Sequence, residues 1–453
     1  MYTSRRAHSR TRARFGATLI GTAAVSLILA SCSAPGPATG AADAPSTTIS
    51  SPVTVTEVAA LGKVTMSIWA DTLEEPFLTK MIPVFEKKYP NVTVVPTYKS
   101  FDDLIATVVN AAASANPPDV FEGNNGYAVD GTLVKGKLVR PLTDVASAYG
   151  WADGGGESTL EAARWNAAGT RFGSGTLYGM SPISEVQSIY YNKAKLTKLG
   201  LKPPTSMAEL AADLPVIKKA GEIPIELGNA DQWSATHIFS DIAATKQDPK
   251  SIAAWVGGKP GSTFDTAGNR AAATELTAWA NAGYFDPGYN GITDDQANQK
   301  FAAGQGVFVV GGSWNSANLG SSNFGAAPIV SGGSGGSAQA WHISTKSKVV
   351  VADAAFLAML RSPQVAQNIV TDAGLLPANT EGVTGTTDVQ KQTLENLKET
   401  QKADTQIGYY DWTTSDMLTV VGQQTQDLMA GRITSAQFTA KIQATWVAGH
   451  TSK

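Results

Sequence analysis

Residues 64–69 read Val-Thr-Met-Ser-Ile-Trp, and this alternation of apolar and small polar side chains is typical of a β-strand. Apolar residues then recur at every fourth position, at Phe77, Met81 and Phe85, which predicts a helix with one buried face. Pro83 lies inside this stretch, so we expect the helix to be kinked there. The ordered part of the chain therefore begins with a strand and an amphipathic helix.

The alternation of strands and helices continues along the chain. Residues 92–98 and 119–121 predict two further strands, and the apolar positions in 101–108 predict a helix between them. Such alternation favours right-handed βαβ units and a largely parallel sheet. The same patterns return later. They predict buried strands at 188–191 and 307–310, and helices at 271–280, 351–360 and 418–447.

The first residues are typical of an export signal. Five arginines precede an apolar run that is too short for a comfortable membrane span. The run ends at residues 29–32, Leu-Ala-Ser-Cys, which resemble a bacterial lipobox. We predict that residues 1–31 are a signal peptide and that Cys32 is lipidated; an incidental cysteine beside a simple cleavage site is the alternative. The pair Arg5-Arg6 leaves a twin-arginine route open beside the general secretory route.

Composition limits the partners of the mature chain. Residues 32–62 are rich in Pro, Ala, Gly, Ser and Thr, which predicts a flexible, lipidated tether. Without the five leader arginines the chain has 30 basic and 38 acidic residues, a formal charge of −8. This acidic balance gives no reason to expect nucleic acid as a partner. Cys32 is the only cysteine, which excludes intramolecular disulfides and a cysteine-based zinc site.

Short motifs follow one another in a fixed order over residues 64–447. They are Pro118-Asp119-Val120-Phe121 with the apolar pattern of 133–143, Tyr178-Gly179-Met180 with 190–193, 301–306 with Gly312-Ser313-Trp314, and the segment 374–378. Together they resemble family 1 extracellular solute-binding proteins, the carbohydrate-importer group related to maltose-binding protein. Each motif is weak alone, whereas the ordered set behind a lipobox is specific.

The resemblance implies an α/β, two-lobed periplasmic-binding-protein-like fold with a central ligand cleft and strands that cross the hinge. We expect the first lobe to comprise residues 63–174 and 323–372, and the second lobe to comprise 175–322 and 373–453. It also implies a binder that captures a sugar, with an oligosaccharide favoured. Lobe closure would then deliver the sugar to the membrane subunits of an ABC transporter, outside the cytoplasmic membrane.

Sugar recognition needs flat aromatic platforms and fixed hydrogen-bonding groups, and the chain supplies both where the resemblance implies the cleft. Trp69 and Asp71 end the first strand, where ligands bind in open α/β sheets. The full set of candidate ligand contacts is Trp69, Asp71, Asn124, Asn125, Glu185, Gln187, Asp231, Trp233, Trp314, Trp341, Asp411 and Trp412. Each has a structural alternative, since tryptophans also fill cores and carboxylates also cap helices.

Motifs for catalysis are weaker than those for binding. The paired carboxylates Glu74-Glu75, Asp102-Asp103 and Asp294-Asp295 are interpreted as solvated surfaces, because adjacent residues point in different directions. The G-x-S-x-G match at 332–336 lies in a repetitive Gly/Ser loop, and 131–137 lacks the Ser or Thr of a phosphate loop. His237, His342 and His450 have no metal-ligand spacing. We therefore expect no enzyme, cofactor or metal.

Two alternatives stay open from sequence. The same fold binds other solutes, and a polyamine site would place several carboxylates beside aromatic rings, whereas a ferric site would cluster tyrosines. Metal chelates and peptides belong to this alternative. A secreted polysaccharide-degrading enzyme is the less favoured reading, since it needs a separated carboxylate pair. We expect a monomer held to the outer face of the bacterial cell membrane by its lipid.

Overall fold

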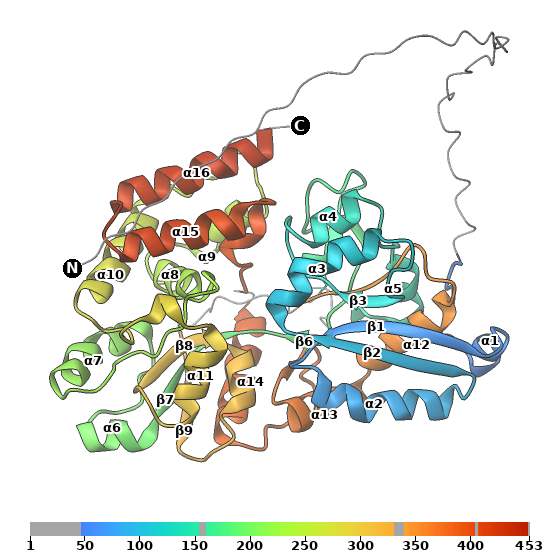
Figure 1. Cartoon of the computed structure of the whole chain (residues 1–453), viewed down its shortest axis with the longest axis horizontal. Coiled ribbons are helices and arrows are strands. Elements are labelled where there is room, and N and C mark those ends of the chain that lie inside the picture. The colour runs from blue at the N-terminus through green and yellow to red at the C-terminus, as the bar shows by residue number, and fades with distance from the viewer. Residues whose placement is uncertain (1–46, 154–159, 330–338, 404–405, 452–453) are drawn as a thin grey trace, which may run out of the picture. The chain divides into compact units, whose positions relative to one another are not determined.

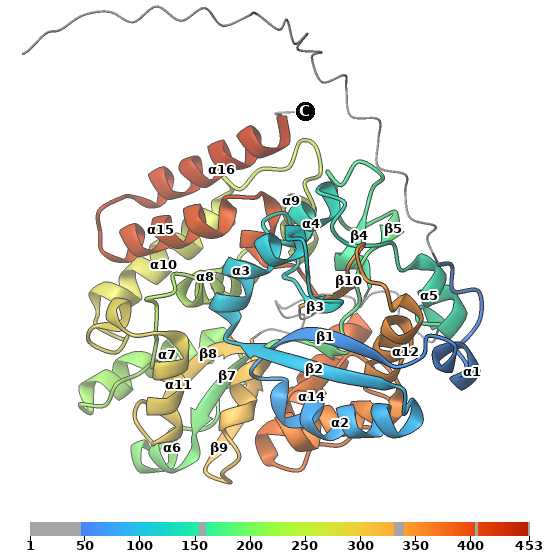
Figure 2. The same ribbon diagram turned by 45° about the vertical axis from the view of Figure 1, so that its right-hand side comes forward.

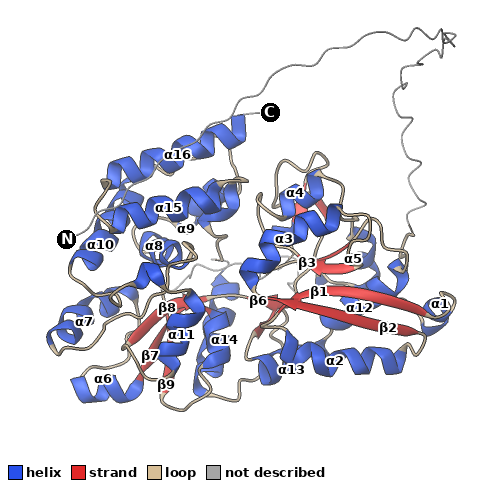
Figure 3. Cartoon of the chain, viewed as in Figure 1, coloured by secondary structure: helices blue, strands red, loops and turns tan. Residues whose placement is uncertain are grey.

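The computed structural model describes residues 47–153, 160–329, 339–403 and 406–451, and Figures 1 and 3 show how their helices and strands are arranged. The predicted signal peptide, Cys32, residues 32–46 of the predicted tether and the loop at 331–337 lie outside the described residues. Among the helices of the described ranges, none is long and apolar enough to cross a membrane.

The first sheet has the strand order β10-β3-β1-β2. Its strands are β1 (Val64–Asp71), β2 (Val92–Lys99), β3 (Val120–Glu122) and β10 (Trp341–Ile343). β1 pairs in parallel with both β2 and β3, and β10 joins β3 in antiparallel. The crossover helices are α2 (Glu75–Lys88) and α3 (Phe101–Ala113). The predicted βαβ alternation is confirmed in this sheet.

The two faces of the first sheet are buried by different helices (Figures 1 and 2). Met66, Ile68 and Ala70 of β1 are fully buried in a cluster with α2 and α12 (Val350–Leu360). On the other face, α3 and α4 (Asp130–Lys135) pack against β3. The helix α2 is continuous through Pro83, whose ring is exposed. Its buried residues are Phe77, Leu78, Ile82 and Phe85, while the predicted Met81 is only half-buried.

The second sheet has the order β8-β7-β9 and is antiparallel throughout. Its strands are β7 (Gln187–Asn192), β8 (Phe308–Gly312) and β9 (Phe324–Pro328). The prediction of a largely parallel sheet is wrong here. β7 and β8 are buried along their whole length. Continuous burial is common in parallel strands, but it does not by itself determine whether a strand runs parallel or antiparallel to its neighbours. β9 also corrects the predicted boundary at residue 323, because this strand still pairs with β7.

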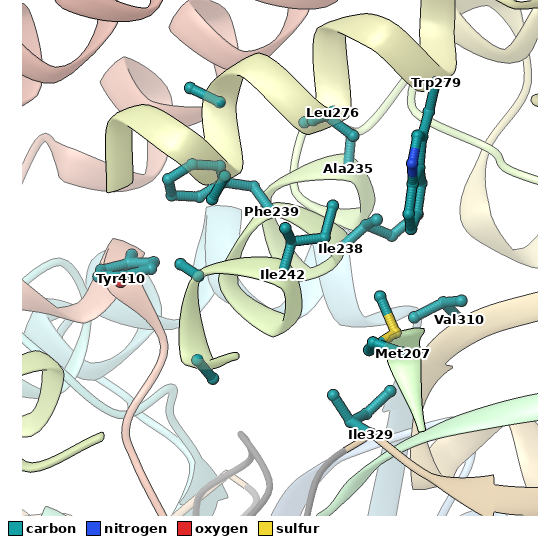
Figure 4. Close-up of a cluster of buried hydrophobic side chains, with 14 of the residues drawn as sticks. Met207, Ala235, Ile238, Phe239, Ile242, Leu276, Trp279, Val310, Ile329 and Tyr410 are labelled. Carbon is teal, nitrogen blue, oxygen red and sulfur yellow. The ribbon is translucent and has the colours of Figure 1, made fainter. Parts of the chain in front are cut away.

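Helices surround the second sheet. They are α6 (Lys193–Leu199), α7 (Met207–Lys219), α8 (Ser234–Ala244), α9 (Pro249–Val256), α10 (Ala267–Asn281), α11 (Asp294–Ala302), α14 (Asp388–Ala403), α15 (Met417–Met429) and α16 (Ser435–Thr451). Every residue of α8 is buried, and Figure 4 shows Ile238, Phe239 and Ile242 of this helix near Leu276 and Trp279 of α10. The predicted helix at 418–447 is two helices, α15 and α16.

Three crossings between the two lobes can be located from the described residues on either side of them. The first crossing follows β6 (Ile183–Ser184), and the third precedes β11 (Leu376–Pro377). β6 and β11 pair in antiparallel, so these two crossings lie side by side. The second crossing falls between Ile329, which packs in the core of the second lobe, and Ala340, which packs in the core of the first. These paired crossings are the structural equivalent of the predicted hinge strands.

The predicted tether is shorter than 32–62. Residues 47–62 belong to the first lobe and contain helix α1 (Val55–Ala59). Ile49, Val53 and Val58 are buried in the first-lobe core. The backbone N–H groups of Ile49 and Val53 donate to side chains of α5 (Thr143–Tyr149) at 2.9 and 2.8 Å. The low apolar content of the segment concealed these three anchors.

Candidate ligand-binding site

A pocket lies where the two lobes face each other. The first lobe contributes residues that follow β1 and β3, and the second contributes α8, the start of α11, and the segments around Trp314 and Trp412. The empty volume is about 920 Å³, solvent at the mouth included. The size and position of the pocket agree with a ligand cleft between lobes.

The pocket brings together seven of the predicted residues. They are Asp71, Asn124, Glu185, Trp233, Trp314, Asp411 and Trp412. These residues come from segments that are far apart in the chain, so the fold and not local sequence assembles them. Their contact with a ligand stays a prediction.

The acidic wall of the first lobe begins where β1 ends. Asp71 is 4% exposed, and its Oδ1 accepts from the backbone N–H of Leu73 at 2.8 Å. Burial raises the pKa of Asp71 to about 6, despite the hydrogen bonds from Leu73 and Thr72. Glu74 lies in the next turn and is 3% exposed. Burial raises the pKa values of both Glu74 and Glu122, and the charge of Asp71 raises both further, so this pair holds a proton at neutral pH.

Asn124 is held in place by a buried ion pair behind the pocket. The carboxylate of Asp130 accepts from the backbone N–H of Asn124 at 2.9 Å and lies 3.1 Å from Nε2 of His342. Nδ1 of His342 lies 2.9 Å from the carbonyl oxygen of Tyr178. Burial alone would lower the pKa of His342, but the charge and hydrogen bond of Asp130 outweigh it and raise the pKa. The Gly123 backbone contacts this pair so closely that a side chain there would collide with it.

The second lobe contributes a continuous wall of aromatic rings. The centroids of Trp233 and Trp314 are 5.8 Å apart, and those of Trp314 and His237 are 5.7 Å apart. His237 stacks on Tyr409 at 4.3 Å, and Tyr409 meets Trp412 edge to face at 5.4 Å. Burial lowers the pKa of His237 to about 3, so its ring is neutral. These rings offer apolar faces to the pocket.

Carboxylates of the second lobe lie among these rings. Glu185 accepts from the hydroxyl of Tyr409 at 3.2 Å, and burial raises the pKa of Glu185 to about 8. Asp294 accepts from Asn298 at 2.8 Å and has a pKa of about 7 for the same reason. Asp411 is 8% exposed, and burial raises its pKa to about 6. Asp295 is exposed at the mouth.

The two lobes touch on both sides of the pocket. The backbone N–H of Tyr127 donates to the carbonyl of Trp412 at 2.9 Å. Phe101 of α3 meets Trp233 edge to face, with ring centroids 6.3 Å apart. Gly126 has φ +92°, and a Cβ atom there would lie 2.5 Å from Cα of Trp412. The lobes are therefore in contact through main-chain atoms as well as side chains.

Five predicted residues do not line the pocket. Trp341 is 0% exposed and packs against Phe356 in the first-lobe core, so our prediction of ligand contact is wrong for it. The others lie nearby. The amine of Lys99 lies over the ring of Trp69, and the side-chain amide of Gln187 donates to the Tyr409 hydroxyl. Asn125 is buried, and the carboxylate of Asp231 accepts from the backbone N–H of Asp294.

The sequence analysis missed several lining residues. Glu74, Asp294 and Asp295, which we assigned to solvated surfaces, line the pocket. The assignment treated each acidic pair by itself, whereas Glu74 lies one turn beyond Asp71 at the strand end and Asp294 begins α11 beside Trp314. Phe101, His237 and Tyr409 also line the pocket, and no local sequence signal separates them from core residues.

Comparison with known proteins relates this architecture to one group. The model of the family described as bacterial extracellular solute-binding protein matches residues 67–367. An uncharacterized ABC transporter extracellular-binding protein of Pyrococcus horikoshii is 24% identical over 178 residues, and this match covers 38% of each chain.

Solved structures share the fold at low sequence identity. A protein from a study of xylan utilization by the thermophilic bacterium Caldanaerobius polysaccharolyticus is 22% identical, with a TM-score of 0.71 over 84% of this chain and all of that one. A chitin oligosaccharide binding protein is 17% identical, with a TM-score of 0.71 over 86% and 100% of the chains. A solute-binding protein in complex with raffinose is 18% identical, with a TM-score of 0.64 over 85% and 100%. The predicted two-lobed α/β fold is confirmed.

Proposed function

Since the chain belongs to the bacterial extracellular solute-binding protein family, we propose that it captures a sugar, with an oligosaccharide favoured, and delivers it to an ABC transporter. The family is extracellular, so the protein works outside the cytoplasm. We further propose that lipid on Cys32 holds it to the outer face of the membrane, with the transporter's membrane subunits as its partners. Its members bind solutes, and we propose no catalytic role.

One observation carries the sugar assignment: an aromatic wall faces carboxylates across an interlobe pocket. Sugar rings have apolar C–H faces that pack on Trp233, Trp314 and Trp412, and hydroxyl groups that donate to carboxylate oxygens. The similarity to structures of a chitin oligosaccharide binding protein and a raffinose complex supports the same ligand class.

Closure follows from the placement of these groups on both lobes. A sugar that contacts Asp71 on one lobe and Trp314 on the other is bound fully only when the lobes approach each other. Binding therefore favours the closed arrangement by differential contacts, and the paired crossings β6 and β11 absorb the rotation. The transporter would then recognise the closed form.

A ligand screen tests the proposal. Purified protein covering residues 47–453 is examined by thermal shift and calorimetry against xylo-, malto-, chito- and raffinose-type sugars. A binder at a hundred times its Kd should stabilise the fold by about 2.7 kcal/mol. A clear shift with a non-sugar solute, and none with any sugar, would overturn the sugar assignment. Recovery of the intact sugar after incubation is expected, and hydrolysis products would favour the enzyme alternative.

The aromatic wall gives a sharper prediction. Trp314→Ala should raise the Kd for the bound sugar about 10- to 100-fold, because it removes ~1.5–3 kcal/mol of apolar contact. Calorimetry measures the change. Tyr284→Ala is the matched control, since it removes a partly buried ring of the same lobe outside the pocket. Equal affinities for the two variants would contradict a platform role for Trp314.

A further inference from the structure

The pocket is lined by acidic side chains, and a neutral sugar brings no positive charge to them. Six carboxyl side chains line it, and none of the described lining residues is lysine or arginine. Residues 330–338, which precede the lining residue Gln339, contain no charged residue either. The side-chain amine of Lys99 lies 4.5 Å from the centre of the Trp69 ring, and Trp69 does not line the pocket.

Three of these carboxylates also have oxygens without a partner. Oδ2 of Asp71, Oε2 of Glu74 and Oδ1 of Asp411 have no hydrogen-bond partner among the described residues. All three residues are more than nine-tenths buried, at 4%, 3% and 8% exposure. A buried carboxylate oxygen with no donor costs about 1–3 kcal/mol, so each of them favours a ligand that brings a donor. They come from both lobes, and all three residues line the same pocket.

We propose that the captured sugar carries a protonated amine, which binds the unpartnered carboxyl oxygens of Asp71, Glu74 and Asp411. This inference deepens the proposed function and rests on it. An ammonium group offers three donors and one positive charge, and its hydrogen bonds to carboxylates are about twice as strong as neutral ones. The ring of Trp412, which lines the same pocket, adds attraction for a nearby cation.

Repulsion among the acidic side chains of the pocket supports the same ligand. Besides burial, the charges of Asp295 and Asp102 raise the pKa of Asp71, and the charge of Asp71 raises the pKa of Glu185. These carboxyl groups therefore oppose one another across the cleft. A ligand cation relieves this repulsion, whereas a neutral hydroxyl supplies only hydrogen bonds.

Matched pairs of sugars test the inference. Calorimetry at pH 7 compares glucosamine oligomers with N-acetylglucosamine oligomers of equal length and linkage, and the free amino sugars with glucose, galactose and mannose. The amine form should bind about tenfold tighter or more, and its affinity should fall as salt rises. Spermidine serves as the amine without a sugar ring.

Each outcome decides between the two proposals. If neutral sugars bind as tightly as their amines, the charged-ligand inference fails and sugar capture stands. If spermidine binds and no sugar does, both proposals fail, and the pocket is a polyamine site. If no compound in either set binds, both are also overturned.

Charge-removing variants separate binding from folding. Asp71→Asn and Asp411→Asn should each weaken amine binding about tenfold, while the neutral partner changes little. The unliganded Tm of each should stay or rise, because a repelling charge is lost. Glu395→Gln, on an exposed carboxylate of α14, is the control and should change neither quantity. An equal loss for neutral and amine ligands in both variants would overturn the inference.

Discussion

At the scale of single residues, the site depends on groups that lie behind the pocket. The buried Asp130–His342 pair fixes the backbone N–H of Asn124 and thereby the loop after β3. Removing one member of a buried pair is costly because the other is left uncompensated. The geometry of Asn124 is therefore set from the first-lobe core.

The His342 pair makes stability depend on pH. Since the folded pKa of His342 is raised above 6.5, its contribution is fully present below pH ~6.5 and is lost as the pH rises through the folded value. Urea unfolding from pH 6 to pH 9 should show the wild type lose this contribution. His342→Gln should be less stable at pH 6 by about 3–5 kcal/mol, and the difference should shrink as the pH rises. A difference that is constant with pH would contradict the charged pair.

At the scale of elements, the sequence predicted the helices and strands whose apolar residues recur at regular spacing. The order β1, α2, β2, α3, β3 follows directly from apolar spacing in residues 64–122. The antiparallel direction of the second sheet did not follow, because fully buried strands look alike in either direction. The helix α1 was missed because only three apolar anchors lie in a polar segment.

In the site, too, the residues that could be predicted are those with a local sequence signal. The place of Asp71 in the pocket was predictable because Asp71 ends a strand, and that of Trp233 and Trp314 because they lie in polar or Gly-rich turns. Trp341 was not separable from them, because its burial depends on how α12 covers β10. The sequence analysis assigned Glu74 and Asp294 to solvated surfaces, but both line the pocket. The direction of a side chain on its own helix or strand does not reveal which distant segment will pack beside it.

The segment before β1 gives a prediction for truncated chains. A chain that begins at residue 47 should unfold at the temperature of the longest mature form. A chain that begins at residue 63 should be less stable by several kcal/mol, because Ile49, Val53 and Val58 each bury an apolar side chain worth about 1.5–3 kcal/mol. Calorimetric Tm values measure both. Equal Tm values would mean that residues 47–62 do not stabilise the first lobe and act only as a tether.

At the scale of the whole molecule, the backbone contact between Gly126 and Trp412 limits how far the lobes can close. Gly126→Ala should weaken sugar binding tenfold or more, because its methyl group would collide with Trp412 only when the lobes meet. Calorimetry gives the affinity, and small-angle scattering gives the change on ligand addition. Gly288→Ala is the control, since Gly288 has a similar φ of +86° and open space around its Cβ position. Identical affinities of the two variants would show that this contact does not limit closure.

The missing side chain at position 126 has a wider consequence. Because only the glycine hydrogen separates the two lobes at this point, even a methyl group there would act as a wedge between them. A receptor held ajar in this way would bind its sugar weakly although every pocket residue remained intact, and uptake would fall without any change at the recognition surface.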